Sequence, residues 1–213
     1  MKKIIPLVDV SALRLQKPFI LTDSDVEKDQ QNRFLDHGMD FNKDLQLTGR
    51  YCYHPFNTVT IDNQGRCYVC ICQAWLPISV GNILNFNSFE EIVQSPRARE
   101  IQRSIVDGSY RYCDHTTCNV IIGKQLNPKI DHKPDTINWI NFAIDDSCNL
   151  QCPSCRTELR FVKEGTEFEL RTQISDHVAQ LISNHNEFIR FTLSGDGDPF
   201  ASHVYRNILE NLK

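Results

Sequence analysis

The first clear pattern of apolar and polar positions begins with residues 58–61, two threonines, a valine and an isoleucine, which favour an extended strand. The Asp-Asn-Gln-Gly sequence of residues 62–65 has the composition of a tight turn, in which glycine supplies a positive φ. Residues 66–72 are predicted to return as the second strand, and another extended piece begins at residues 81–83. This part of the chain is therefore predicted to contain a β-hairpin.

Two helices are predicted after the hairpin. Ser88 is a favourable helix N-cap, with Glu91 three residues further on, as in a capping box. Ser95 followed by Pro96 indicates the start of a second helix, because proline suits the first helical position. Apolar residues recur along this second helix up to a predicted stop at Gly108.

The C-terminal part of the chain shows alternating strand and helix patterns. Residues 137–144 and 187–193 are apolar runs of strand length, and residues 168–182 place apolar side chains at helical spacing between them. Residues 202–213 are predicted to form a further helix. This order of elements indicates a parallel βαβ unit.

We divide the chain into four segments. Residues 1–50 are a lead-in with little apolar patterning, apart from a loose alternation over residues 8–19. Residues 51–120 form a small cysteine-rich α+β module with the hairpin and the helices. Residues 121–136 are a polar, proline-containing linker, and residues 137–213 carry the α/β units.

Composition places the chain among ordinary globular proteins. It has 213 residues, of which 40% are hydrophobic and 23% charged, and its formal net charge is −4. This negative net charge does not indicate a basic surface that would bind a nucleic acid. No apolar run is long enough to span a bilayer. The apolar residues after Lys3 are interrupted by Pro6 and Asp9, so we do not interpret them as a signal peptide.

The nine cysteines are a high and odd number. A disulfide framework is disfavoured, because no secretion signal precedes them. A reducing cytoplasm keeps thiols free to bind metals. We therefore expect a cytoplasmic protein in which several cysteines are metal ligands.

Three cysteines form the most specific motif of the chain. Cys148, Cys152 and Cys155 have C-x3-C-x2-C spacing and lie just after the strand predicted at residues 137–144. A four-iron cluster has four corners, so three thiolates leave one iron open, and an open position is typical of a catalytic metal centre. A zinc site and unligated structural thiols are the alternatives.

At these residues the sequence resembles the radical S-adenosylmethionine (radical SAM) superfamily. The resemblance implies that the three thiolates hold a [4Fe–4S] cluster after the first strand of a partial (β/α)6 TIM-type barrel. It also implies that S-adenosylmethionine binds the open iron and is cleaved reductively to a 5′-deoxyadenosyl radical. Ser154 stands where the superfamily often has an aromatic residue that packs on the adenine of this cofactor.

A glycine-rich segment after the strand predicted at residues 187–193 fits the same superfamily. Gly195, Asp196, Gly197 and Asp198 resemble its Gly-Gly-Glu motif, whose backbone and carboxylate meet the methionyl amino group of the cofactor. The resemblance therefore implies that these residues bind the cofactor. Aspartate in place of glutamate shortens the carboxylate side chain by one methylene.

Six cysteines precede the linker, and four of them fit a second motif. Cys52, Gly65 and Cys70 have the spacing C-x12-G-x4-C, and the segment closes with Cys113 and Cys118. This arrangement resembles the SPASM and twitch domains, which hold auxiliary [4Fe–4S] clusters in radical SAM proteins, usually after the barrel. The resemblance implies that Cys52, Cys70, Cys113 and Cys118 fully coordinate one auxiliary cluster.

The other two cysteines of this segment are Cys67 and Cys72. In an alternating strand Cys70 and Cys72 point the same way and Cys67 points the other way. Cys72 is therefore the main rival of Cys70 as a ligand. A four-cysteine zinc site is the alternative to a cluster, because both use tetrahedral thiolates.

The resemblance gives one main interpretation of function. It is an enzyme, or its N-terminal part, with two [4Fe–4S] clusters and S-adenosylmethionine, which modifies a peptide or protein. Its electrons would come from a donor such as a flavodoxin or ferredoxin. Only two βα units are visible, so we expect a fragment, or a split enzyme whose barrel another chain completes. The alternatives are a non-catalytic iron–sulfur module that acts with a partner and a zinc-stabilised interaction protein.

Overall fold

The structure is a computed structural model. It describes residues 47–128, 136–152, 155, 158–187, 189–193 and 197–211. The first 46 residues of the predicted lead-in and the middle of the predicted linker lie outside the described residues, as do Ser154, Gly195 and Asp196.

The described residues form a mixed α/β fold with a five-stranded mixed sheet and six helices. The strand order is β4-β3-β2-β6-β7. β3 pairs antiparallel with β2 and β4, whereas β6 runs parallel to β2 and β7. The strands are β2 (Thr58–Asp62), β3 (Arg66–Tyr68), β4 (Gly81–Asn82), β6 (Trp139–Ala143) and β7 (Arg190–Leu193). A separate antiparallel pair joins β1 (Arg50–Tyr51) to β5 (Asn127–Pro128).

The predicted hairpin is confirmed, and its turn has the expected chemistry. Gly65 has a φ of +75°, and its N–H donates to the carbonyl oxygen of Asp62 at 2.9 Å. The Asp62 carboxylate accepts from the N–H groups of Gln64 and Arg66, both at 2.9 Å. The turn is therefore closed by backbone and side chain together.

The second strand of the hairpin is shorter than predicted. β3 ends at Tyr68, so the expectation of a strand that continues to Cys72 is wrong. Beyond Tyr68 the backbone pairing of β3 with β2 ends, and a side-chain contact takes its place. The Thr60 hydroxyl donates to the carbonyl oxygen of Cys70 at 2.6 Å. The chain then forms a turn, in which the Trp75 N–H donates to the Cys72 carbonyl oxygen at 3.2 Å. The strand alternation used to orient Cys70 and Cys72 therefore does not apply.

Side-chain caps define where the two predicted helices of the module begin, as expected. The Ser88 hydroxyl accepts from the Glu91 N–H, and the Ser95 hydroxyl accepts from the Ala98 N–H. The second helix ends just before Gly108, whose φ is +82°. The helices of this part are α3 (His54–Asn57), α4 (Phe89–Gln94), α5 (Pro96–Val106) and α6 (Asn119–Ile122), with a 3-10 turn at Ile83–Asn85.

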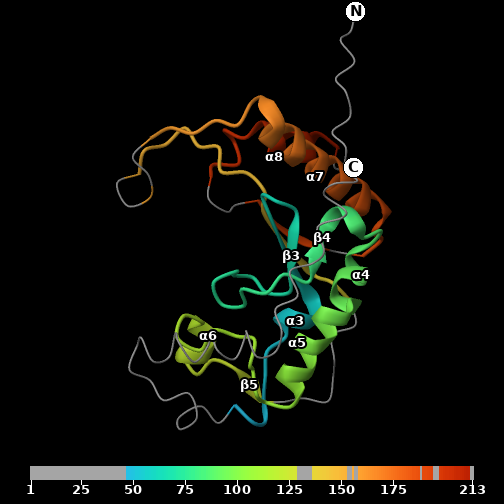
Figure 1. Ribbon diagram of the computed structural model, residues 1–213, viewed down its shortest axis with the longest axis vertical. Helices are drawn as coiled ribbons and strands as arrows, with labels where there is room; N and C mark the ends of the chain where they lie inside the picture. Colours follow the sequence, from blue (N-terminus) through green and yellow to red (C-terminus); the bar gives the residue numbers. More distant parts are fainter. Residues whose placement is uncertain are drawn as a thin grey trace, which may run out of the picture.

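The C-terminal part has the predicted order of strand, helix, strand and helix. β6 and β7 pair in parallel, with Ile140 opposite Phe191, and they are connected through α7 (Gly165–Asn184). α8 (His203–Asn211) packs against α7 (Figure 1). No closed barrel is seen in the described part of the chain. Neither α7 nor any other helix described here is long and apolar enough to cross a membrane.

One hydrophobic core connects the cysteine-rich segment to the βα units. Its centre is the pair of parallel strands β2 and β6, where Val59, Ile61, Ile140 and Phe142 have no exposed surface. The sheet therefore continues from the hairpin into the strand that leads to Cys148.

Candidate metal centres

Four of the cysteines line one pocket. Cys52 follows β1, Cys70 follows β3, and Cys113 and Cys118 lie between α5 and α6. The remaining lining residues are mostly aromatic or aliphatic: His54, Pro55, Trp75, Leu76, Tyr110, Val120, Ile121 and Leu126. The fold thus brings together the four thiols named by the second motif, in largely apolar surroundings.

Burial raises the pKa of all four thiols. It is the largest cause in each case, and it raises the pKa of Cys52 to about 11 and that of Cys70 to about 12. The pKa values of Cys113 and Cys118 are raised as well, and neighbouring thiols add to the effect. Because the thiolate is the form that binds a metal, metal binding in this pocket must release protons.

Peptide N–H groups partly offset this effect at three of the four thiols. In each case a donor lies two residues after the cysteine: His54 for Cys52, Cys72 for Cys70 and Val120 for Cys118. A hydrogen bond to sulfur stabilises the thiolate, and such bonds help to set the reduction potential of an iron–sulfur cluster. The pocket therefore contains N–H donors that can stabilise metal-bound thiolates.

Contacts from the sheet favour Cys70 over Cys72 at this pocket. The hydroxyl of Thr60, which is 1% exposed, holds the Cys70 carbonyl oxygen, and the Asn141 amide donates to the next carbonyl oxygen at 3.3 Å. Cys72 is not among the lining residues, although its thiol is near enough to help raise the pKa of Cys118.

Cys67 occupies a different environment. It lies within β3, opposite Ile61, and has no exposed surface. Its thiol donates to the carbonyl oxygen of Gly65 at 3.8 Å. Cys67 is thus packed in the sheet and does not line the pocket.

The donor set is all thiol, which is the usual ligand type for iron–sulfur clusters. Among the residues with described positions, no group of three or more His, Cys, Asp or Glu side chains is placed to hold one metal ion. A four-iron cluster binds each thiolate at a different iron, so its ligands stand farther apart than those of a single ion. The cavity measures about 20 Å³, room for about one water molecule. Lining side chains must therefore move outward to admit a cluster.

The metal-free protein should lose stability at alkaline pH because of these thiols. The pKa values of Cys52 and Cys70 are higher in the folded protein than the ordinary value of 9.0. The folded state therefore binds more protons above pH 9, and its stability falls between about pH 9 and 12. Urea unfolding under reducing, anaerobic conditions should show this decrease of the unfolding free energy with rising pH. Cys70→Ala should make the decrease smaller. An equal pH dependence of the unfolding free energy in the wild type and in Cys70→Ala would contradict the expectation.

The second predicted centre lies in the loop after β6. Cys148 is 8% exposed and forms an antiparallel bridge with Arg160. The Leu150 N–H lies 3.4 Å from the Cys148 Sγ, two residues on, as in the first pocket. Cys152 and Cys155 are exposed, and the Cys155 N–H donates to the Cys152 carbonyl oxygen at 2.9 Å. One thiol is thus anchored while the other two residues are open to solvent.

Gly197 brings the loop after β7 against the loop after β6. A Cβ at this position would lie 2.5 Å from the Ser147 carbonyl oxygen and 2.8 Å from the Asp146 carbonyl carbon, so this approach requires glycine. The Asp198 N–H donates to the same Ser147 oxygen at 2.9 Å. The loops meet because parallel strands end at the same edge of the sheet.

A buried ion-pair network, which the sequence analysis did not identify, supports the start of the cysteine loop. The side chain of Arg171, on α7, is 1% exposed and pairs with Asp145, Asp146 and Glu167. The Asp145 carboxylate also accepts from the Ser202 hydroxyl. Burial by itself lowers the pKa of Arg171, but the hydrogen bonds with Asp146 and Asp145 raise it overall. Arg171 is therefore a fixed positive charge in this network.

Tyr205 adds a second support from α8. Its hydroxyl donates to the Phe142 carbonyl oxygen at 2.8 Å and accepts from the Ile144 N–H at 3.2 Å. The residue has no exposed surface. Both helices of the C-terminal part therefore bind the backbone or carboxylates between β6 and Cys148.

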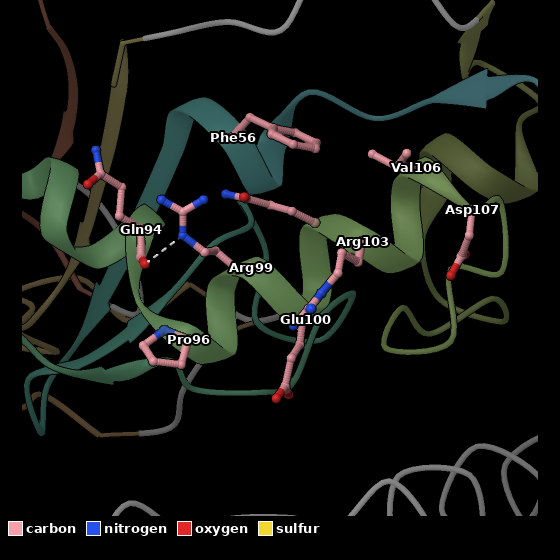
Figure 2. A pocket seen from close by; sticks show the side chains of 9 residues that line it. Phe56, Gln94, Pro96, Arg99, Glu100, Arg103, Val106 and Asp107 are labelled. Atoms are coloured by element: carbon pink, nitrogen blue, oxygen red, sulfur yellow. Dashed lines mark hydrogen bonds between the residues drawn. The ribbon is translucent and has the colours of Figure 1, made fainter.

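A larger groove of about 930 Å³ runs along α5 (Figure 2). Within it, the Arg99 side chain donates to the Gln94 carbonyl oxygen at 3.1 Å. The lining residues are Phe56, Gln94, Pro96, Arg99, Glu100, Gln102, Arg103, Val106 and Asp107. None of the predicted site residues is among them, so this groove is separate from both centres.

The pocket is lined by four thiols, a ligand set that both an iron–sulfur cluster and a zinc ion accept. Residues 52–119 match the family model of SPASM, an iron–sulfur cluster-binding domain. The chain therefore contains a SPASM iron–sulfur cluster-binding domain, a type of domain typical of radical SAM enzymes. No radical SAM domain is detected. No curated protein and no solved structure matches the chain.

Proposed function

We propose that this chain is a radical SAM iron–sulfur protein with two [4Fe–4S] centres. In the SPASM domain, Cys52, Cys70, Cys113 and Cys118 coordinate the auxiliary cluster through four thiolates. The observation that carries this assignment is the convergence of these four thiols on one pocket, within the residues that match the domain.

The second centre uses Cys148, Cys152 and Cys155, which leave one iron open to S-adenosylmethionine. When bound, the cluster and this cofactor supply 5′-deoxyadenosyl radical chemistry, for which the protein provides position and surroundings. Support comes from the contact of Gly197 and Asp198 with the loop that leads to Cys148. This contact lies beyond the C-terminal ends of parallel strands, where ligands bind in open α/β sheets.

The residues of the chain hold the cysteine loop from three directions. Arg171 pairs with the two carboxylates before the loop, and Tyr205 binds peptide groups at the end of β6. The backbone of Asp198 binds Ser147 from the neighbouring loop. Such support keeps ligands at fixed positions, which cluster binding requires. In this proposal Ser154, Gly195 and Asp196 also bind the cofactor.

The substrate in this proposal is a peptide or protein. Exposed apolar side chains lie close in sequence to residues that bond to the cysteine loop: Leu150, Leu159, Phe161 and Phe200. Apolar side chains exposed near the cofactor site suit contact with a peptide better than with a small polar metabolite. A flavodoxin or ferredoxin serves as the electron donor.

Cleavage of S-adenosylmethionine tests the catalytic part of the proposal. Protein reconstituted anaerobically with iron and sulfide is reduced with dithionite, and 5′-deoxyadenosine is quantified by mass spectrometry. Wild-type protein should form 5′-deoxyadenosine, Cys152→Ala should form none, and Cys72→Ala should match the wild type.

Other results would select the alternatives. Iron at the auxiliary centre without any 5′-deoxyadenosine would favour a non-catalytic iron–sulfur module. Zinc without iron would favour a zinc-stabilised interaction protein. Unchanged product formation by Cys152→Ala would contradict the assignment of the second centre.

A further inference from the structure

Tyr110 has a backbone conformation that is unusual for a bulky residue. It lies between the end of α5 and Cys113, with a φ of +47° and no exposed surface. Its N–H donates to the Ser104 carbonyl oxygen, and its own carbonyl oxygen accepts from the Cys113 N–H, both at 2.9 Å. A positive φ in such a residue is energetically unfavourable and persists only where the surrounding structure holds it. The surrounding fold therefore imposes this position on the side chain.

The imposed position puts Tyr110 in the wall of the cysteine pocket. Its phenol oxygen is buried, and the described residues offer no acceptor for the phenol proton. The Cys52 peptide N–H is near enough to lower the pKa of the phenol, but an N–H group is itself a donor. A buried hydroxyl without an acceptor is costly and requires an explanation, such as a ligand that accepts the proton.

The phenol remains a donor at neutral pH. Burial is the main cause that raises the pKa of Tyr110, and the nearby thiols of Cys52 and Cys113 raise it further. An acceptor that arrives in the pocket meets a protonated phenol.

We propose that the Tyr110 hydroxyl donates a hydrogen bond to a sulfur of the auxiliary cluster and thereby positions the cluster and raises its reduction potential. This inference rests on the ligand set given under the proposed function. Cluster sulfurs are negatively charged acceptors, and a hydrogen bond stabilises them most in the reduced, more negative state. Tyr110 is thus a positioning residue that acts through the cluster.

The test uses full-length protein in which Cys148, Cys152 and Cys155 are replaced by alanine, so that only the auxiliary centre contributes signals. We call this protein the triple-alanine parent. Tyr110→Phe in this parent should bind the same amount of iron and sulfide. Its midpoint potential, from a redox titration followed by EPR, should shift to a more negative value. After exchange into D2O, pulsed EPR should show the loss of one strongly coupled deuteron.

Tyr112→Phe is the matched control. Tyr112 is also buried, lies two residues away, and does not line the pocket. Its replacement should change neither the potential nor the deuteron coupling. This comparison separates a hydrogen bond at the cluster from a general effect of losing a buried phenol.

A second measurement covers the case in which Tyr110→Phe does not retain a cluster. Replacing all tyrosines by 3-fluorotyrosine makes each phenol a stronger donor, so the potential of the parent should rise. An unchanged potential would overturn the proposal, as would equal potentials and deuteron couplings in the parent and Tyr110→Phe. A parent that binds no iron would overturn the ligand set itself, and the role of Tyr110 with it.

Discussion

Alanine at Cys70 is expected to remove the auxiliary cluster, whereas alanine at Cys72 should leave it bound. Cys70 lines the pocket, and Thr60 and Asn141 hold the backbone beside it, while Cys72 is not a lining residue. Loss of one of four thiolates leaves an iron without a protein ligand in an apolar pocket. In the triple-alanine parent, iron and sulfide should fall from about four of each per chain to near zero for Cys70→Ala.

The controls for this experiment come from the same hairpin. Cys67→Ala alters a buried thiol that lies in β3 and not in the pocket, so it reports the effect of a lost packed sulfur alone. It should retain the cluster, with a modest loss of stability. A cluster that survives in Cys70→Ala but disappears in Cys72→Ala would assign the ligand to Cys72.

Methionine at Arg171 should produce the largest loss of folding stability. Arg171 is buried with Asp145, whose side chain has no exposed surface, so its removal leaves an uncompensated buried carboxylate. Breaking a buried ion pair in this way costs about 3–5 kcal/mol. Urea unfolding of the metal-free protein at neutral pH should show a decrease of this size.

Arg160→Met is the matched control, because Arg160 also pairs with Asp146 and Glu167. Its side chain is 48% exposed, so the loss should be at most about 1 kcal/mol. Similar small losses in both variants would show that the Arg171 network does not stabilise the fold. Retained stability in Arg171→Met would contradict its role in supporting the cysteine loop.

Local features of the fold could be predicted from the sequence because short-range chemistry determines them. The turn at Gly65 needs a positive φ, and the caps at Ser88 and Ser95 need a hydroxyl three residues before an N–H. The parallel order of β6 and β7 followed from the alternation of strand and helix patterns. The turn and the caps depend only on residues close by in the chain, and the parallel pairing follows from the order of the elements.

Long-range features could not be predicted in the same way. The end of β3 at Tyr68 depends on a hydroxyl from β2, and the parallel pairing of β2 with β6 joins segments on either side of the predicted linker. Arg171 did leave a signal, because it shares a helical face with Ile174 and Val178. A charged residue at an apolar position of a helix indicates a buried partner of opposite charge. The position of Arg171 in the sequence does not identify Asp145 as that partner.

The same distinction between local and long-range features applies to the candidate sites. The resemblance to the SPASM and twitch domains named the four thiols that line the pocket, with Cys72 left as a rival to Cys70, and the C-x3-C-x2-C spacing named the three in the loop after β6. Tyr110 was missed, because neither its positive φ nor its buried hydroxyl can be inferred from residue type. The ligand roles of all seven cysteines stay predictions that the experiments above address.

The central claim is that Cys52, Cys70, Cys113 and Cys118 hold one four-iron cluster. Mössbauer spectroscopy on the triple-alanine parent, reconstituted with isotopically enriched iron and analysed for iron, sulfide and zinc, tests this claim most directly. The account predicts about four irons and four sulfides per chain with the spectrum of a single [4Fe–4S] cluster. Zinc in place of iron, or iron without inorganic sulfide, would contradict it.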